Sequence, residues 1–325
     1  MITRRYLLQQ TTALVAVTAV DSLRRTQAQQ SAGASAPMFP GFKTSKVQTT
    51  GAIINVLSGG QGPPVLLLHG NPQTHVLWHK VAPRLASEFT LVVADLRGYG
   101  DSSKPADGEN HSNYSKRAMA LDQVEVMSNF GFQKFAVVGH DRGGRVAHRM
   151  ALDHPDRLTK LAVLDIVPTH KLYHSVSREF ANAYYHWFFL IQPAPFPETL
   201  IGNSAEFFLR HHFDPLMPKA VTPEAFAEYL RCFRNPATIH ATCEDYRAAA
   251  SIDLEHDEAD LNRKIACPLL ALWAERGAMH RMFDVAATWR ERAVSVKGKV
   301  LPGGHFLPEE APDETLAELR AFLKS

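Results

Sequence analysis

The stretch KFAVVGHDRGGRVA, residues 134–147, decides the fold of this chain. Residues 135–138 are a short apolar run typical of a buried parallel strand, and a helical pattern begins after the turn GHDRGG at residues 139–144. Glycines on both sides of a central residue let a strand turn sharply into a helix, which is the pattern of a nucleophile elbow. We therefore predict that Asp141 stands above the sheet at the N-terminus of a helix, where the helix dipole favours negative charge.

Similar apolar runs occur before and after this turn, and helical patterns alternate with them. Runs of this length that end in polar or glycine-rich turns are typical of parallel strands buried on both faces. The sequence therefore predicts an α/β class fold with a mostly parallel sheet flanked by helices. We expect strands at residues 65–68, 91–94, 135–138, 161–164, 269–273 and 299–301, and a closing amphipathic helix at residues 313–324.

Residues 171–265 interrupt this alternation, because strand runs disappear there and helical spacing takes over. Half of the aromatic residues of the chain fall within residues 171–250. We predict a helical cap at 171–265, whose inner face walls an apolar pocket over the carboxyl ends of the strands. Residues 37–170 and 266–325 would then form the core.

The N-terminal segment, residues 1–36, differs in composition from the rest. Arg4 and Arg5 form a twin arginine, and the apolar run at 13–20 is too short to span a bilayer. With small residues downstream, the segment resembles a twin-arginine export signal. We therefore expect a periplasmic protein without stable membrane insertion of the mature chain, or a cytoplasmic one if the segment does not act as a signal.

Composition excludes several classes. The chain has 325 residues, 45% of them hydrophobic, and a formal net charge of +2, so neither a disordered chain nor a nucleic-acid-binding protein is expected. The three cysteines (Cys232, Cys243 and Cys267) lack the paired spacing of thiolate metal sites, and we expect buried free thiols.

The identity of the central elbow residue restricts the chemistry. A carboxylate at Asp141 is ionised at neutral pH without help and can displace a leaving group from saturated carbon, leaving an alkyl ester on the enzyme. Hydrolysis of esters and peptides, for which a serine nucleophile is suited, is therefore not expected. A helix-capping aspartate is the alternative when the residue is taken alone.

Such an ester requires a base that activates water and an acid that orients the base. His305, in a Gly-Gly-His turn after the last predicted strand, occupies the place of that base in the chain order. Asp165 and Glu275 both follow strands and are both candidates for the acid; we favour Asp165 because it directly ends its strand. The loop at residues 68–73, which contains Asn71, and the backbone N–H of Arg142 are expected to form the oxyanion hole.

Several separate motifs, in order, closely resemble those of the fluoroacetate (haloacetate) dehalogenases of the α/β-hydrolase superfamily. The resemblance covers nearly all of residues 38–325. The motifs are HGxPQTH at 69–75, GHDRG at 139–143, KLAVLD at 160–165, YHW at 185–187, CEDYRA at 243–248 and GHFLPEE at 304–310.

The resemblance implies Asp141 as nucleophile, His305 as base and Asp165 as its partner, with no metal and no cofactor. It assigns Arg142 and Arg145 to the substrate carboxylate, and guanidinium forks do bind carboxylates in bidentate fashion. The cap residues that it assigns to the departing halide are His186, Trp187 and Tyr246.

Two positions depart from the pattern of that family. Asn71 replaces an aromatic residue and resembles the haloalkane dehalogenases, in which this asparagine helps to hold the halide. Arg97 resembles the epoxide hydrolases. These changes leave the halide preference open.

We therefore expect hydrolytic dehalogenation of short 2-haloacids, with haloacetate and water giving glycolate and halide. An epoxide hydrolase with the same nucleophile, aided by Tyr246 and by Tyr184 or Tyr185, is one alternative. A non-catalytic ligand-binding homologue is another. The sequence leaves open the natural substrate and the oligomeric state, including a homodimer.

Overall fold

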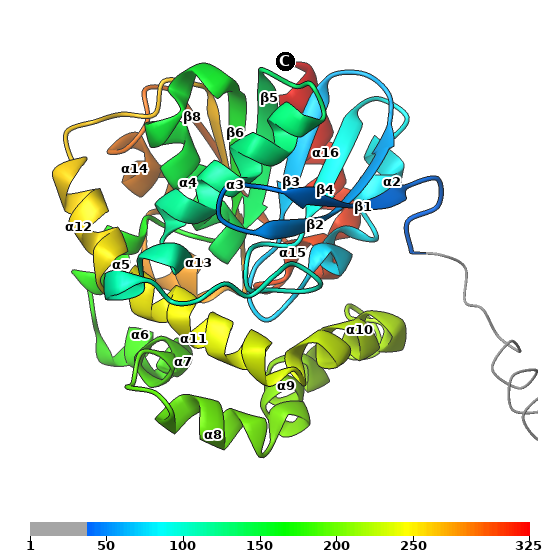
Figure 1. The fold of residues 1–325 in the computed structure, drawn as a ribbon. Coiled ribbons are helices and arrows are strands. Elements are labelled where there is room, and N and C mark those ends of the chain that lie inside the picture. The colour runs from blue at the N-terminus through cyan, green and yellow to red at the C-terminus, as the bar shows by residue number, and fades with distance from the viewer. Residues whose placement is uncertain (1–37) are drawn as a thin grey trace, which may run out of the picture. The chain divides into compact units, whose positions relative to one another are not determined.

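The computed structural model describes residues 38–325. The predicted export segment at residues 1–36 lies outside the described residues. Residues 41–325 form one compact unit built around a sheet of eight strands, in the order β1-β2-β4-β3-β5-β6-β7-β8 (Figure 1). The strands are β1 Lys43–Gln48, β2 Ile53–Gly60, β3 Pro64–Leu68, β4 Thr90–Ala94, β5 Phe135–His140, β6 Leu158–Leu164, β7 Leu269–Ala274 and β8 Val296–Leu301.

The sheet is parallel from β4 to β8, as the apolar runs predict, whereas β1 and β2 run antiparallel at one edge. Strands β1 and β2 were not predicted from the sequence. The strand β1 is largely exposed and polar, and β2 ends in two glycines, so neither shows the continuous apolar run of a buried strand. The edge strand β8 begins earlier than expected, at Val296; the next three residues, Lys297, Gly298 and Lys299, are exposed and form no apolar run that would have predicted this start.

Helices cover both faces of the sheet. In Figure 1, α3 and α4 lie side by side in front of the sheet and α16 lies behind it. The larger helices of this part are α3 Lys116–Asn129, α4 Arg142–Asp153, α14 Val285–Arg290 and α16 Pro312–Lys324. Short helical turns occur at η1 His75–Trp78, α2 Ala82–Leu85, η2 Glu109–Tyr114, η3 Pro155–Arg157, α13 Ala278–Met282 and α15 Leu307–Glu310.

Every described element between β6 and β7 is a helix. In Figure 1, α6 to α11 lie below the sheet, next to the carboxyl ends of its strands, and α5 and α12 lie toward the left. The division of the chain into a core and a separate cap stays a prediction, because residues 41–325 group as one unit. The elements are α5 Thr169–Tyr173, α6 Arg178–Ala183, α7 Tyr185–Leu190, α8 Phe196–Gly202, α9 Ala205–Phe213, η4 Asp214–Leu216, α10 Pro223–Phe233, α11 Pro236–Ala249 and α12 Ile252–Ala259.

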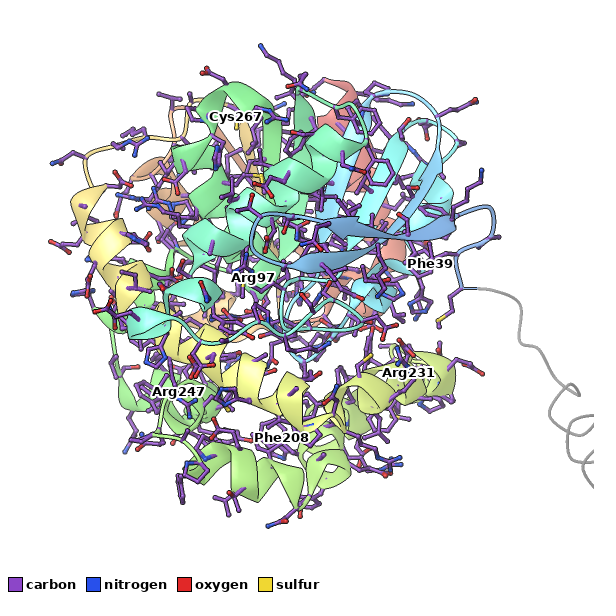
Figure 2. The ribbon with its side chains drawn as sticks, viewed as in Figure 1. Phe39, Arg97, Phe208, Arg231, Arg247 and Cys267 are labelled. Atoms are coloured by element: carbon purple, nitrogen blue, oxygen red, sulfur yellow. The ribbon has the colours of Figure 1, made fainter. Side chains whose placement is uncertain are left out.

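The side chains in Figure 2 fill the space between these layers, and the interior is apolar along the central strands. Cys232 and Cys243 are buried free thiols, and Cys267, labelled in Figure 2, is a half-buried one. Among residues 38–325, no helix is both long enough and apolar enough to cross a membrane.

Candidate active site

Asp141 occupies the strained turn between β5 and α4. Its backbone has φ 43° and ψ −114°, a left-handed region that few non-glycine residues adopt. The turn needs glycine at Gly139 and Gly143. A Cβ atom at Gly139 would lie 2.4 Å from the backbone oxygen of Gly143, and one at Gly143 would lie 2.5 Å from that of His69. Strain of this kind persists where the surrounding structure fixes it, commonly at functional sites.

The Asp141 carboxylate is buried and surrounded by positive charge. Its Oδ2 atom accepts a hydrogen bond of 3.1 Å from the backbone N–H of Asn71, and its Oδ1 atom lies 4.0 Å from Nε of Arg145. Burial alone would raise the pKa of Asp141, but the charges of His305, Arg145 and other neighbours lower this pKa to about 2. The carboxylate is therefore ionised at neutral pH.

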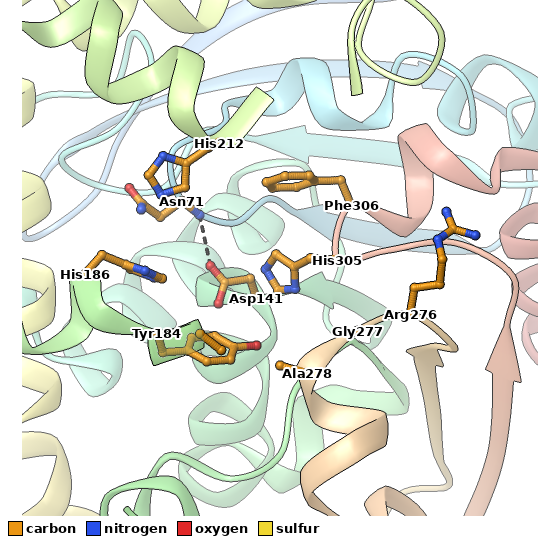
Figure 3. A pocket seen from close by; sticks show the side chains of 11 residues that line it. Asn71, Asp141, Tyr184, His186, His212, Arg276, Gly277, Ala278, His305 and Phe306 are labelled. Atoms are coloured by element: carbon orange, nitrogen blue, oxygen red, sulfur yellow. Dashed lines mark hydrogen bonds between the residues drawn. The ribbon is translucent and has the colours of Figure 1, made fainter. Parts of the chain in front are cut away.

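His305 lies beside Asp141 and pairs with Asp165. Nδ1 of His305 is 2.6 Å from Oδ2 of Asp165, and Figure 3 shows the His305 ring next to the Asp141 carboxylate. Burial would lower the pKa of His305, but the hydrogen bond and the charge of Asp165 raise it above its ordinary value. Of the two candidate acids, Asp165 therefore contacts the histidine, whereas Glu275 is exposed after β7.

The loop that carries His305 is held by a carboxylate from α15. The backbone N–H groups of Gly304 and Phe306 donate to Glu310 at 2.7 Å and 3.0 Å. On the other side, Oδ1 of Asp165 accepts a hydrogen bond of 2.9 Å from the backbone of Ala274. Both members of the pair are thus held in place by further hydrogen bonds.

Arg142 and Arg145 are buried on the first turns of α4, close to Asp141. Nη1 of Arg145 donates to the backbone oxygen of Val167 and to Thr169. Nε and Nη2 of Arg142 donate to the carboxylate of Asp245 at 2.8 Å and 2.7 Å. Asp245 therefore occupies the Nε and Nη2 side of the Arg142 guanidinium, and the assignment of Arg142 to a substrate carboxylate stays a prediction.

Three buried N–H donors of arginine and tryptophan side chains near Asp141 lack a hydrogen-bond partner among the described residues. They are Nη1 of Arg142, Nε of Arg145 and Nε1 of Trp187. The Arg145 guanidinium lies 4.7 Å from the Trp187 ring centre, so these donors are close together. Since an unsatisfied buried donor costs free energy, such a group points to a ligand that accepts hydrogen bonds.

His186 and Tyr246 complete the group of residues that we assigned to a halide. The hydroxyl of Tyr246 accepts a hydrogen bond of 3.3 Å from Nδ2 of Asn71, and so keeps its own hydrogen for another acceptor. Burial lowers the pKa of His186 to about 3, and the ring is therefore neutral at neutral pH. The Tyr246 and Trp187 rings meet edge to face at 5.9 Å.

A cavity of about 240 Å³ opens beside Asp141 (Figure 3). Four of the predicted site residues line it: Asn71, Asp141, His186 and His305. Arg142, Arg145, Trp187 and Tyr246 are not among its lining residues and lie more deeply buried. The other lining residues are Ala183, Tyr184, His212, Arg276, Gly277, Ala278 and Phe306.

Some features of the site differ from what the sequence predicts. Arg97 does not line the cavity; its guanidinium pairs with Asp122 at 2.6 Å and 2.7 Å. His212 was missed because it stands in no motif. Asp245 lies in the motif CEDYRA, but its role depends on a contact across 103 residues, which no local pattern predicts.

Two groups of side chains among residues 38–325 bring three potential metal ligands together. They are His170, His174 and Glu258, and Asp107, His240 and Glu244. Neither group includes a residue that lines the cavity.

Comparison with known proteins agrees with this geometry. The family model of the alpha/beta hydrolase fold matches residues 63–312. A fluoroacetate dehalogenase from Burkholderia sp is 48% identical over 289 residues, covering 88% of this chain and 95% of the relative. A soluble epoxide hydrolase from Corynebacterium sp. (strain C12) is 35% identical, covering 80% of this chain and 89% of the relative.

Solved structures give the same assignment. A protein from Nostoc sp PCC 7120 described as an α/β hydrolase superimposes with a TM-score of 0.85 at 62% identity, covering 87% of this chain and 98% of that one. The chain therefore belongs to the α/β-hydrolase family and, within it, to the group that includes the fluoroacetate dehalogenase of Burkholderia.

Proposed function

We propose that this protein hydrolyses the carbon–halogen bond of short 2-haloacids, converting haloacetate and water into glycolate, halide and a proton. The observation that carries this proposal is the group of three unpaired buried donors, on Arg142, Arg145 and Trp187, beside the ionised Asp141. A small anion with a leaving group on its α-carbon matches both features. The 48% identity to a fluoroacetate dehalogenase supports the same substrate class.

The first step is a displacement at saturated carbon. An oxygen of the Asp141 carboxylate attacks the α-carbon and forms an ester bond, while the carbon–halogen bond breaks and halide leaves with the electron pair. The reaction needs an ionised nucleophile, and the low pKa of Asp141, about 2, provides one. Close positioning of nucleophile and carbon supplies much of the rate acceleration in such a step.

The second step is hydrolysis of the Asp141 ester. His305 accepts a proton from water, and the resulting hydroxide attacks the ester carbonyl; Asp165, at 2.6 Å, stabilises the protonated ring. The Asn71 N–H, which already donates to Asp141, is placed to stabilise the oxyanion. Loss of one oxyanion donor typically costs about 3–4 kcal/mol of transition-state stabilisation. Collapse of the intermediate expels glycolate, whose oxygen takes the proton from His305, and the Asp141 carboxyl then loses its own proton and is ionised again.

The proposed anion-binding groups divide into two sets. Nη1 of Arg142 and Nε of Arg145 hold the substrate carboxylate, each through the nitrogen that has no partner in the described part of the chain. Nε1 of Trp187, the hydroxyl of Tyr246 and the ring of His186 receive the halide. Donors aimed at the leaving group stabilise charge that develops only as the bond breaks, which favours the transition state.

An epoxide hydrolase is the second candidate function. The 35% identical Corynebacterium relative favours it, as does Tyr184 in the cavity wall, since a tyrosine hydroxyl protonates the oxygen of an opening ring. The buried cations at Arg142 and Arg145 favour an anionic substrate instead. Halide release from fluoroacetate and chloroacetate should be measured beside hydrolysis of a neutral epoxide such as styrene oxide. Turnover of haloacetate supports the dehalogenase, and turnover of the epoxide alone reverses the ranking.

We also propose that residues 1–36 direct export to the periplasm. The support is the twin arginine at Arg4 and Arg5, followed by an apolar run. Replacing both arginines by lysine should keep the protein in the cytoplasm, whereas unchanged fractionation of the double variant contradicts the proposal.

A further inference from the structure

We infer that Asp245 is a positioning residue, which holds the Arg142 guanidinium so that only Nη1 is offered to the substrate carboxylate. This inference rests on the proposed function, since it assigns a role within the same site. Asp245 lies on α11, far in sequence from Arg142 on α4, and it is fully buried. Its carboxylate is engaged by Arg142, Tyr99 and Lys116, so it would act through Arg142 and not on the substrate itself.

Asp245 accepts hydrogen bonds from three side chains. Arg142 contributes three of these contacts, from Nε to Oδ2 at 2.8 Å, from Nη2 to Oδ1 at 2.7 Å and from Nη2 to the main-chain oxygen at 2.8 Å. The hydroxyl of Tyr99 donates to Oδ2 at 2.7 Å, and Nζ of Lys116 donates to Oδ1. A bidentate pair of this kind fixes the plane and direction of a guanidinium more firmly than a single bond.

The face of the guanidinium is fixed as well. The central carbon of the guanidinium lies 4.2 Å from the centre of the Tyr246 ring, so Tyr246 packs against its flat face. Asp245 binds the edge of the same guanidinium. With Nε and Nη2 engaged, the remaining nitrogen, Nη1, is buried and has no partner within residues 38–325. Rotation of the guanidinium to any other direction would break the pair with Asp245.

The charges of this network balance. Lys116 also lies 3.2 Å from Asp253, so two cations, Arg142 and Lys116, face two buried carboxylates. Burial alone would raise the pKa of Asp245, but Arg142 and Lys116 lower it well below its usual range, which keeps it charged. Because the two carboxylates offset the charges of Arg142 and Lys116, the direction of the free Nη1–H group adds to the electrostatic attraction in the recognition of an incoming carboxylate.

The test compares Asp245→Asn with Asp253→Asn. Both changes remove a buried charge next to Lys116, but only Asp245 touches Arg142. Asp245→Asn should lower kcat for chloroacetate by about 10- to 100-fold, because a misplaced substrate reacts that much more slowly. The inhibition constant of acetate should rise by no more than about threefold, because the Arg142 cation remains and is no longer offset by Asp245. Asp253→Asn should keep kcat near that of the unchanged protein.

Thermal unfolding of both variants gives the matching control, since both should lose stability. The inference is overturned if Asp245→Asn keeps its kcat, or if Asp253→Asn loses as much. Should Asp245→Asn not fold, Tyr99→Phe removes one hydrogen bond to the same carboxylate, and kcat should fall by about threefold with unchanged acetate inhibition. An unchanged kcat in that variant overturns the inference. If the unchanged protein releases no halide from chloroacetate, the proposed function itself fails, which is a different outcome.

Discussion

At the scale of single residues, the site separates two tasks between two titrating groups. Asp141 has a pKa of about 2 and stays ionised across the working pH range, whereas the pKa of His305 is raised by Asp165. The displacement step needs only the ionised carboxylate. The hydrolysis step needs a neutral histidine, so the acid limb of the pH profile belongs to His305.

We therefore expect kcat to fall as the pH drops through the raised pKa of His305, while the first turnover continues. Below that pKa, an amount of halide equal to the enzyme should appear rapidly and then stop, because the Asp141 ester forms but is not hydrolysed. Rapid-mixing measurement of halide at several pH values checks this. The same protonation stabilises the fold, because a raised histidine pKa stabilises the native state at low pH and loses this effect as the pH rises. If the initial halide release declines in parallel with kcat, the two steps do not differ in their need for His305.

Trp187 provides a test of the halide site. Trp187→Phe keeps a ring in place but removes Nε1, which has no other hydrogen-bond partner among the described residues. We expect about a 100-fold loss in kcat for fluoroacetate, the size of effect known for one lost transition-state donor. The loss for bromoacetate should be smaller, because bromide leaves with less need of stabilisation. Equal losses for both halides would assign Trp187 to packing.

The sequence indicated which residues lie together in this site better than it indicated their contacts. Asp141 and His305 lie in local motifs whose glycines indicate a tight turn, and Asp165 directly follows an apolar run. Asp245 could not be assigned in this way, because its partner Arg142 comes from another helix and the pairing depends on how α4 and α11 pack. A local sequence pattern predicts the conformation of a turn, but it does not predict which distant side chain pairs with a guanidinium.

At the scale of elements, the strand–turn–helix from β5 to α4 places the nucleophile, and its geometry depends on space at Gly143. Gly143→Ala would place a Cβ atom 2.5 Å from the backbone oxygen of His69. We expect a loss of about 1–3 kcal/mol in the free energy of unfolding, together with lower activity, as for other overpacked positions. Urea unfolding and halide release measure the two effects.

Gly202→Ala is the matched control for that change. Gly202 ends α8, and a Cβ atom there meets nothing within 4 Å among the described residues. Alanine at this helical position should leave stability equal or slightly higher. A similar loss of stability in both variants would show that the crowding at Gly143 is not its cause.

The elements also show where sequence patterns fail. Central strands such as β5 and β6 are buried on both faces and therefore carry continuous apolar runs, which predicted them correctly. The edge strand β1 is held by pairing with β2, although its side chains are mostly exposed and polar. The formation of β1 depends on backbone hydrogen bonds to β2, and the periodicity of its residues does not predict such pairing.

At the scale of the whole molecule, a cluster of charged side chains joins the helices between β6 and β7 to the rest of the structure. His240 on α11 contacts two carboxylates, Glu198 at 3.0 Å through Nδ1 and Asp107 at 2.9 Å through Nε2. Both ring nitrogens must carry a proton to donate to both carboxylates. Of the neighbouring groups, His111 and Arg247 both pair with Glu244, and Arg247 also pairs with Glu198 at 2.7 Å.

This cluster predicts a pH-dependent contribution to stability. Partial burial would lower the pKa of His240, but the two carboxylates raise it above its ordinary value. The stabilisation is therefore complete below the unfolded pKa of about 6.5 and is lost as the pH rises through the folded pKa. We expect His240→Gln to lower Tm more at pH 6 than at pH 9.

His211→Gln, at an exposed position on α9, is the control, and its effect on Tm should be small at both pH values. The prediction fails if the Tm difference for His240→Gln is independent of pH or grows toward high pH.

The central claim is that Asp141 forms an ester with the substrate, and a single turnover in water enriched in oxygen-18 tests it most directly. With enzyme in excess over chloroacetate, attack of labelled water on the ester carbonyl should leave the label in the Asp141 carboxylate. The hydroxyl of the released glycolate should carry the original oxygen of Asp141. Mass spectrometry of the glycolate and of the peptide that contains Asp141 reads both. Labelled glycolate with an unlabelled peptide would contradict the account, because water would then have attacked the α-carbon directly.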